Sequence, residues 1–180
     1  MKYLCVFCGS SKGGPVKYAE SARRFGEALA ARGLGLVYGG GHIGLMGVLA
    51  DAVLQAGGPV IGVIPRSMVE SELAHERLTE LHVVETMHQR KALMAERACG
   101  FAALPGGFGT ADELFEILTW RQLRLHDKPI GLLNVAGFFD PLLAWMDRTV
   151  EDGFLRREHR SLIHVADESE RLLDLLLGDS

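Results

Sequence analysis

The stretch MHQRKALMAERACGFAALPGGFGTADELFEILTW, residues 87–120, combines a predicted helix, a buried strand, a glycine-rich turn and a second helix. The strand is the apolar run at residues 101–104, and the turn is PGGFGT at residues 105–110. A glycine-rich turn between a strand and a helix points main-chain amides at an anion. The stretch therefore predicts an α/β fold with a phosphate site at this turn.

Short apolar segments alternate with longer segments of helical period along the whole chain. This alternation predicts a doubly wound α/β fold, with a mostly parallel sheet, helices on both faces and right-handed crossovers. The predicted strands are residues 3–7, 35–38, 60–64, 81–84, 101–104 and 130–133. The predicted helices are residues 16–32, 43–56, 86–98, 111–125, 138–152 and 168–177.

The composition favours one domain spanning residues 1–180, because 48% of the 180 residues are hydrophobic and 23% are charged. A net charge of -4 with scattered Lys and Arg argues against binding to nucleic acid. The sequence shows neither a long enough apolar run for a membrane span nor a cleavable signal. The three cysteines make no disulfide framework, so we expect a cytoplasmic protein.

The glycine-rich turn at residues 105–110 is the predicted phosphate site. Gly106, Gly107 and Gly109 would allow positive φ and close main-chain approach, and Ala111 would begin a helix whose free amides favour an anion. Glycine is also common in turns that bind nothing. Three glycines and a threonine in five positions favour binding of a monophosphate.

Two charged elements flank this turn, and each has two interpretations. Thr110 and Glu113 spell the T-x-x-E capping box, so Glu113 is either a helix cap or a carboxylate placed for the sugar of a bound nucleotide. The sequence leaves these roles evenly balanced. Arg90 and Lys91 either form a solvated helix face or bring a guanidinium fork and an ammonium to the phosphate.

Other nucleotide motifs are incomplete. GGGHIG at residues 39–44 fits the dinucleotide pattern, but the next strand ends with Arg66 where an NAD site usually has an acid. The P-loop pattern is missing from the sequence.

The sequence predicts neither a metal nor another cofactor. Cys5 and Cys8 form a single C-x-x-C without a second pair, which favours buried thiols over zinc or redox chemistry. The histidines have no metal-binding spacing, and we assign several of them as ordinary polar or loop residues: His42, His75, His88 and His126.

Several segments together resemble the LONELY GUY family of cytokinin riboside 5'-monophosphate phosphoribohydrolases: CGSS, YGGGHIGLMG, GVIPRSM, MHQRK, LPGGFGTADELFE, LTW and HDKPIGLLN. The resemblance covers nearly the whole chain and implies a Rossmann-like fold and a homodimer. It implies hydrolysis of the N-glycosidic bond of AMP or a cytokinin nucleotide, which yields free base and ribose 5-phosphate. Members are often labelled lysine decarboxylases, a name for which these residues give no chemical reason.

The resemblance also implies residue roles, with Arg90 and Glu113 as the catalytic pair. The implied substrate-binding residues are Glu72, Lys91, Gly106, Gly107, Phe108, Gly109, Thr110, Ala111, Asp112 and Thr119. Further candidates for nucleotide contacts are Gly9, Ser10, Gly41 and Met87.

The implied chemistry agrees with the residues at the predicted site. Cleavage of a ribosyl C–N bond builds positive charge at C1', which a carboxylate can stabilise while it positions water. Phosphate bound at the glycine-rich turn would hold C1' within reach of Glu113. The alternative function is a nucleotide-binding or signalling module of the same fold that cleaves nothing.

Overall fold

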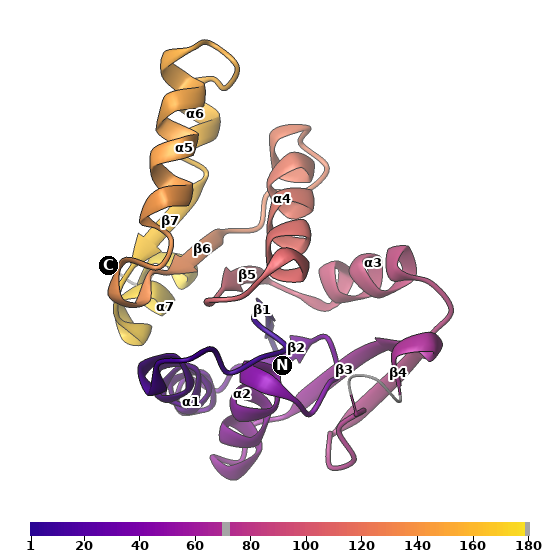
Figure 1. The fold of residues 1–180 in the computed structure, drawn as a ribbon. Coiled ribbons are helices and arrows are strands. Elements are labelled where there is room, and N and C mark those ends of the chain that lie inside the picture. Colours follow the sequence, from indigo (N-terminus) through magenta and orange to yellow (C-terminus); the bar gives the residue numbers. More distant parts are fainter. Residues whose placement is uncertain (70–72, 179–180) are drawn as a thin grey trace.

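The computed structural model describes residues 1–69 and 73–178, and its centre is a seven-stranded parallel sheet (Figure 1). The strand order is β4-β3-β2-β1-β5-β6-β7, and every neighbouring pair is parallel. The strands are β1 (Tyr3–Phe7), β2 (Gly35–Tyr38), β3 (Val60–Pro65), β4 (Glu80–Val84), β5 (Gly100–Ala103), β6 (Ile130–Leu133) and β7 (Ile163–Ala166).

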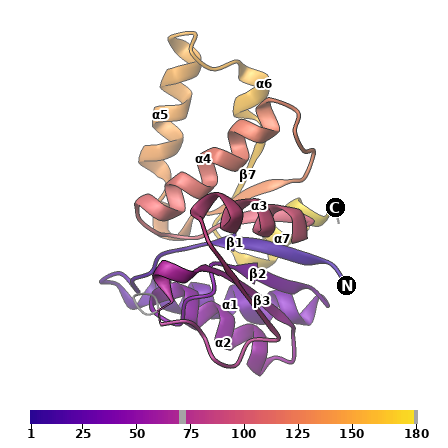
Figure 2. The same ribbon diagram turned by 90° about the vertical axis from the view of Figure 1, so that its right-hand side faces the viewer.

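Helices cover both faces of the sheet, as Figure 2 shows with α1 and α2 below it and α3 and α4 above. The α-helices are α1 (Val16–Ala31), α2 (Gly44–Gln55), α3 (Met87–Arg97), α4 (Phe108–Gln122), α5 (Asp140–Glu151), α6 (Arg157–Arg160) and α7 (Ser169–Leu177). Two short 3-10 helices are η1 (Arg66–Met68) and η2 (Val135–Gly137).

The two faces of the sheet carry separate apolar cores. Side chains of α1, α2 and α7 pack on one face, including the fully buried Phe25 and Leu49. Side chains of α3, α4 and α5 pack on the other face, including Met94 and Ile117. Because strands β1, β2, β3, β5 and β6 lie between these two cores, they are apolar along almost their whole length.

The strand order places a switch point between β1 and β5. The chain winds outward from β1 through β2 and β3 to β4, then returns through α3 to β5 on the other side of β1. In open α/β sheets ligands bind at such a point, beyond the carboxyl ends of the strands. In this chain that place is beside the turn after Phe7 and the turn after Ala103.

Most of the predicted elements are confirmed within one to three residues. Strands β1, β2 and β6 have the predicted bounds, and the doubly wound α/β class is confirmed, with all seven strands parallel. The sequence interpretation missed β7, a short edge strand of the form IHVA in which a histidine interrupts the apolar run. It also missed the four-residue helix α6.

Of the two interpretations of Thr110 and Glu113, the capping box is wrong. Helix α4 begins at Phe108 with Gly107 as its N-cap, so it starts three residues before the predicted start at Ala111, and Thr110 is already its third residue. A capping box does form at α3, where the Thr86 side chain accepts from the N–H of Gln89 at 3.1 Å. Gln89 in turn accepts from the N–H of Thr86 at 3.3 Å.

Across residues 1–69 and 73–178, none of the helices is both long and apolar enough to cross a membrane.

Replacing Thr86 with alanine tests the observed capping box. The change removes the acceptor for the Gln89 N–H, so we expect the free energy of unfolding to fall by about 1 kcal/mol in urea denaturation. Thr86→Ser is the control, because it keeps the hydroxyl and should stay within about 0.5 kcal/mol of the parent. An alanine variant as stable as the parent would show that the box contributes nothing.

Candidate active site

A cavity of about 190 Å³ lies at the switch point of the sheet. The turns after β1 and β5 meet beside it, where the N–H of Gly9 donates to the carbonyl of Pro105 at 3.1 Å. Helix α2 joins them, because the N–H of Leu45 donates to the carbonyl of Gly9 at 2.9 Å. The cavity therefore sits where three main-chain segments converge at the carboxyl edge of the sheet.

The glycines after β5 are needed for space. The expectation of positive φ at Gly106, Gly107 and Gly109 is wrong, since none of them is among the positive-φ residues of the described chain. A methyl group at Gly106 would overlap Thr110 Oγ1 and lie 2.9 Å from the Gly9 nitrogen. At Gly107 and Gly109 no described heavy atom lies within 4 Å of such a methyl group, which leaves the start of α4 open to a ligand.

The first turn of α4 offers donors to an anion. The N–H groups at the start of a helix have no partner within the helix, and the helix dipole favours negative charge there. Thr110 adds a hydroxyl from a side chain that is only 5% exposed, and its Oγ1 has no hydrogen-bond partner among the described residues. A buried hydroxyl without a partner is costly, so it indicates a ligand oxygen at this position.

Glu113 lies on α4 one turn beyond Thr110 and lines the same cavity. Because α4 starts at Phe108, its carboxylate is too far along the helix to cap the first turn. Burial raises the pKa of the Cys8 thiol well above its usual range, and the charge of Glu113 raises it further. The negative charge of Glu113 therefore acts on Cys8, which also lines the cavity, and Cys8 stays a neutral thiol.

Arg90 is 4% exposed, so the solvated-face interpretation is wrong. Its Nε donates to the carbonyl of Val63 at 3.0 Å, and its Nη2 donates to the carbonyl of Gly39 at 2.7 Å. Its Nη1 lies 3.8 Å from the sulfur atoms of Met68 and Met87. Carbonyls of β3 and of the residue after β2 therefore fix the guanidinium in the lining of the cavity.

Lys91 joins α3 to α4. Its Nζ lies 3.1 Å from Asp112 Oδ2 and 3.1 Å from Glu116 Oε2, and its side chain is 11% exposed. Burial alone would lower the pKa of Lys91, but the two carboxylates outweigh it and the pKa is raised. Because Arg90 precedes Lys91 on α3, and Asp112 and Glu116 flank Glu113 on α4, these two ion pairs tie the helix segment of Arg90 to that of Glu113.

The structure brings most of the predicted site residues into the cavity lining: Gly9, Ser10, Met87, Arg90, Gly107, Phe108, Gly109, Thr110, Asp112 and Glu113. Gly106 borders an adjoining hollow of about 240 Å³. Ala111 donates its N–H to the Gly107 carbonyl inside the helix, and Gly41 accepts from the Tyr38 hydroxyl. Glu72 lies outside the described residues.

The sequence interpretation missed five further lining residues: Val6, Cys8, Gly39, Met46 and Met68. Cys8 and Gly39 directly follow β1 and β2, and the rule that ligands bind at the carboxyl ends of strands would have indicated both. The methionines gave no comparable signal, because they also suit a core.

Thr119 lies apart from this cavity. It lines a groove of about 520 Å³ between α4 and α5, together with Trp145 and Phe154. Its hydroxyl donates to the carbonyl of Phe115 at 2.7 Å within the helix.

Comparison with known proteins places this chain in a family. A family model described as "Possible lysine decarboxylase" matches residues 46–176. The cytokinin riboside 5'-monophosphate phosphoribohydrolase LOG1 of Arabidopsis thaliana is 48% identical over 175 residues, covering 97% of this chain and 82% of that protein. The chain belongs to the cytokinin riboside 5'-monophosphate phosphoribohydrolase family.

Further relatives support this membership. The probable cytokinin riboside 5'-monophosphate phosphoribohydrolase LOGL5 of Oryza sativa subsp. japonica is 49% identical over 170 residues, covering 94% of this chain and 69% of that protein. Among solved structures, the molybdenum cofactor binding protein of Rippkaea orientalis has a TM-score of 0.75 at 18% identity, covering 99% and 96% of the two chains. At that identity the likeness shows the fold alone. The family membership and the Rossmann-like fold expected from the sequence motifs are confirmed.

A double variant tests the ion pair that joins α3 and α4. Lys91→Met leaves the partly buried carboxylate of Glu116 without its cation, so we expect the free energy of unfolding to fall by about 2 kcal/mol. Adding Glu116→Gln should restore about half of this loss, because the unpaired charge is removed. Urea denaturation measures both.

Arg97→Met serves as the matched control, because Arg97 is exposed in the last turn of the same helix and should tolerate the change within about 0.5 kcal/mol. If the double variant is no more stable than Lys91→Met, Lys91 does not act through Glu116.

Proposed function

We propose that this chain, acting as one domain over residues 1–180, hydrolyses the N-glycosidic bond of a purine nucleoside 5'-monophosphate. The products are the free base and ribose 5-phosphate. One observation carries the proposal: a single cavity contains an anion-binding helix start, a buried unpartnered hydroxyl and the carboxylate-bearing Glu113. The printed names of the relatives describe this activity on cytokinin riboside 5'-monophosphates.

The arrangement of donors supports binding of the 5'-phosphate at the start of α4. The amides of residues 108–110 and Thr110 Oγ1 supply hydrogen bonds, and Arg90 supplies a fixed positive charge in the same cavity. A phosphate held there places the ribose toward Glu113, one helical turn further along α4. Binding energy at the phosphate is thus used to orient the reacting carbon.

The size of the cavity suggests which part of the substrate it encloses. About 190 Å³ is less than the roughly 300–1,000 Å³ of pockets that bury a whole drug-sized ligand. It suits the ribose 5-phosphate portion, so the base would lie toward the mouth, where the Phe108 side chain is 95% exposed. Residues outside the cavity would then decide between an adenine and a cytokinin base.

The proposed reaction breaks the bond between C1' and the base nitrogen. Positive charge develops at C1', and the ionised Glu113 stabilises it while orienting a water molecule toward that carbon. The water oxygen bonds to C1', and the departing base takes up a proton. Arg90 holds the phosphate and ribose, so that C1' stays aligned with the water.

The rival function is a module of this fold that binds a nucleotide and leaves it intact. A binding module needs only the donors at α4, whereas a carboxylate facing the bound sugar opposes an anionic ligand. Glu113 in the cavity therefore favours hydrolysis.

The free thiols Cys5, Cys8 and Cys99 support the predicted cytoplasmic location, because they suit a reducing compartment.

Glu113→Gln tests the proposed chemistry. The variant keeps the size and polarity of the side chain but removes its charge, so we expect the release of adenine from AMP to fall by about 100-fold or more. Chromatography of free base, with isopentenyladenosine monophosphate as a second substrate, measures the rate. The melting temperature, measured alongside, separates a loss of chemistry from a loss of folding.

Glu96→Gln is the control, because Glu96 is exposed on α3 and should leave turnover unchanged. Parental activity in Glu113→Gln would remove the carboxylate from the mechanism. A parent that binds AMP but releases no base would favour the binding module.

We also propose that the protein is a homodimer formed through the groove between α4 and α5. The groove exposes large apolar side chains, with Trp145 54% and Phe154 87% exposed. Exposed apolar area of this kind marks contact surfaces in soluble proteins. A second copy seated there would also bring a neighbouring chain to Thr119, which one copy alone leaves apart from its own cavity.

Phe154→Asp tests the dimer. Sedimentation of the parent should give twice the mass of one chain, and a buried unpaired carboxylate should shift the variant toward one chain. Val16→Asp is the control, since Val16 is 70% exposed at the start of α1, away from the groove. A parent that sediments as one chain, or a Phe154→Asp variant that remains a dimer, would contradict the proposed interface.

A further inference from the structure

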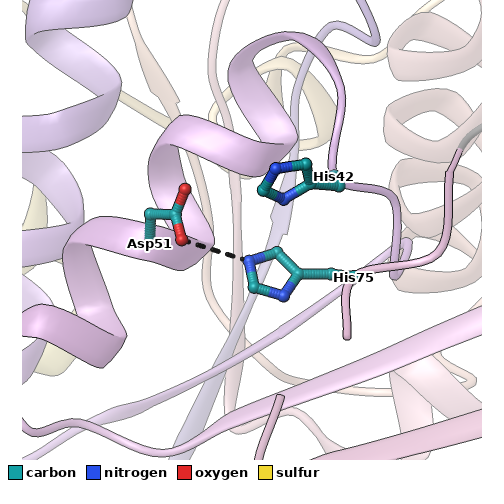
Figure 3. Close-up of side chains that lie close together, drawn as sticks. All are labelled: His42, Asp51 and His75. Carbon is teal, nitrogen blue, oxygen red and sulfur yellow. Dashed lines mark hydrogen bonds and ion pairs between the residues drawn. The ribbon is translucent and has the colours of Figure 1, made fainter. Parts of the chain in front are cut away.

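Two histidines and an aspartate outside the cavity point toward one another, as Figure 3 shows. His75 is 1% exposed, and its Nε2 lies 3.2 Å from Oδ1 of Asp51 on α2. The His42 ring meets the His75 ring edge-on, with centroids 4.7 Å apart. One ligand atom from each of the three residues lies within 4.8 Å of the others, a spacing that raises the question of a metal ion.

The hydrogen bonds of His75 argue against a metal. Its Nδ1 accepts from the N–H of Arg77 at 3.2 Å, so the hydrogen of the neutral ring is on Nε2, which donates to Asp51. A metal on Nε2 would need the hydrogen on Nδ1, where it would face the Arg77 N–H. The Arg77 guanidinium also lies 2.8 Å from Asp51 Oδ1 and already supplies a positive charge.

His75 instead holds residues 73–77 against residues 39–42 of the glycine-rich turn after β2. Its main-chain N–H donates to the Gly40 carbonyl at 3.0 Å, and the His42 N–H donates to the Leu73 carbonyl at 2.9 Å. Gly41 and Ala74 form an antiparallel bridge between these two hydrogen bonds. The side-chain bond to Asp51 ties this short ladder to α2.

The ladder is connected to the cavity through the main chain. Gly39, the residue before Gly40, accepts from Arg90 Nη2 at 2.7 Å and lines the cavity. The fit is tight, because a methyl group at Gly39 would overlap the Arg90 guanidinium. A shift of residues 39–42 would therefore displace Arg90. Contacts lead without a gap from Asp51 through His75 and Gly40 to the proposed catalytic arginine.

We propose that His75 is a positioning residue for the nucleotide site: its neutral ring holds residues 73–77 on residues 39–42, and protonation of that ring releases them and displaces Arg90. This inference rests on the proposed function for its activity readout. Its structural part, the pH-dependent opening of the ladder, stands apart from any turnover.

The sign of the pH effect follows from the groups around His75. Burial lowers the pKa of His75, the contact with Asp51 raises it, and His42 and Arg77 lower it further, with a net lowering from 6.5. Protonation would put a hydrogen on Nδ1 opposite the Arg77 N–H, so the folded ladder disfavours the charged ring. The contribution of His75 is therefore present above pH 6.5 and lost as pH falls through its lowered pKa.

Two variants that cannot ionise separate the roles of the ring nitrogens. His75→Asn can place its side-chain oxygen near the position of Nδ1 and accept from Arg77, and His75→Gln can place its amide near the position of Nε2 and donate to Asp51. At pH 7.5 both should have a kcat/KM for AMP within about tenfold of the parent. Below the lowered pKa of His75 the ratio of variant to parent kcat/KM should rise by up to about tenfold per pH unit, because only the parent takes up the proton.

Comparing parent and variant at the same pH cancels the titration of the AMP phosphate, whose second pKa is about 6. His126→Gln is the matched control. His126 has the same pattern, with Nδ1 accepting from the Lys128 N–H and Nε2 beside the Ile117 carbonyl, but it lies beyond the far end of α4 from the site. Its variant should keep the parental pH profile even if its melting temperature falls.

Amide hydrogen exchange without nucleotide tests the ladder directly. Protection at His42 and His75 should fall in the parent between pH 7.5 and 5.5 after correction for intrinsic rates, and should stay level in His75→Gln. The inference would be overturned if kcat/KM of parent and variants changed in parallel with pH and the protection of the His42 and His75 amides in the parent stayed the same from pH 7.5 to 5.5. If the parent never releases base from AMP, the proposed function fails, while the exchange result still decides whether His75 holds the ladder.

Calorimetric titration with ZnCl₂ gives one more decisive outcome. We expect no binding that depends on these side chains. Micromolar affinity that His42→Ala and Asp51→Asn both abolish would overturn the assignment of His75 as a hydrogen-bonded ring and would make the cluster a metal site.

Discussion

The site depends on how closely two main-chain turns approach at the centre of the sheet. The turn after β5 passes against the turn after β1, with the Gly9 N–H donating to the Pro105 carbonyl, and a side chain at Gly106 would prevent this. This contact sets the start of α4 beside the carboxyl ends of β1 and β2. The amides that could hold a phosphate are therefore positioned by backbone geometry and need few mobile side chains.

The charged groups around this backbone are fixed at a cost in desolvation. Arg90 is buried with two nitrogens bonded to carbonyls at the ends of β2 and β3, and Lys91 is held by two carboxylates of α4. Buried charges of this kind contribute little net stability. They do hold Arg90 in the lining of the cavity that Glu113 also lines, an arrangement that suits an enzyme that aligns C1' with water.

The sequence predicted the class of the fold, and it indicated residues that line one cavity, because both follow from local patterns. Apolar strands between helices indicate a parallel sheet, and PGGFGT indicates an anion-binding turn. It could not decide whether Glu113 caps a helix or faces the substrate, because T-x-x-E forms a capping box only when the helix starts right after the threonine. The structure shows that α4 starts earlier, at Phe108. Nor could the sequence indicate the role of His75, because its partners Asp51 and Arg77 lie 24 and 2 residues away and meet it only in the folded chain.

The most direct test of the central claim is a crystal structure of the Glu113→Gln variant with AMP. The account predicts that the phosphate oxygens accept hydrogen bonds from the amides of residues 108–110 and from Thr110 Oγ1, with C1' turned toward residue 113. A phosphate bound away from the start of α4, or a ribose whose C1' faces away from residue 113, would contradict it.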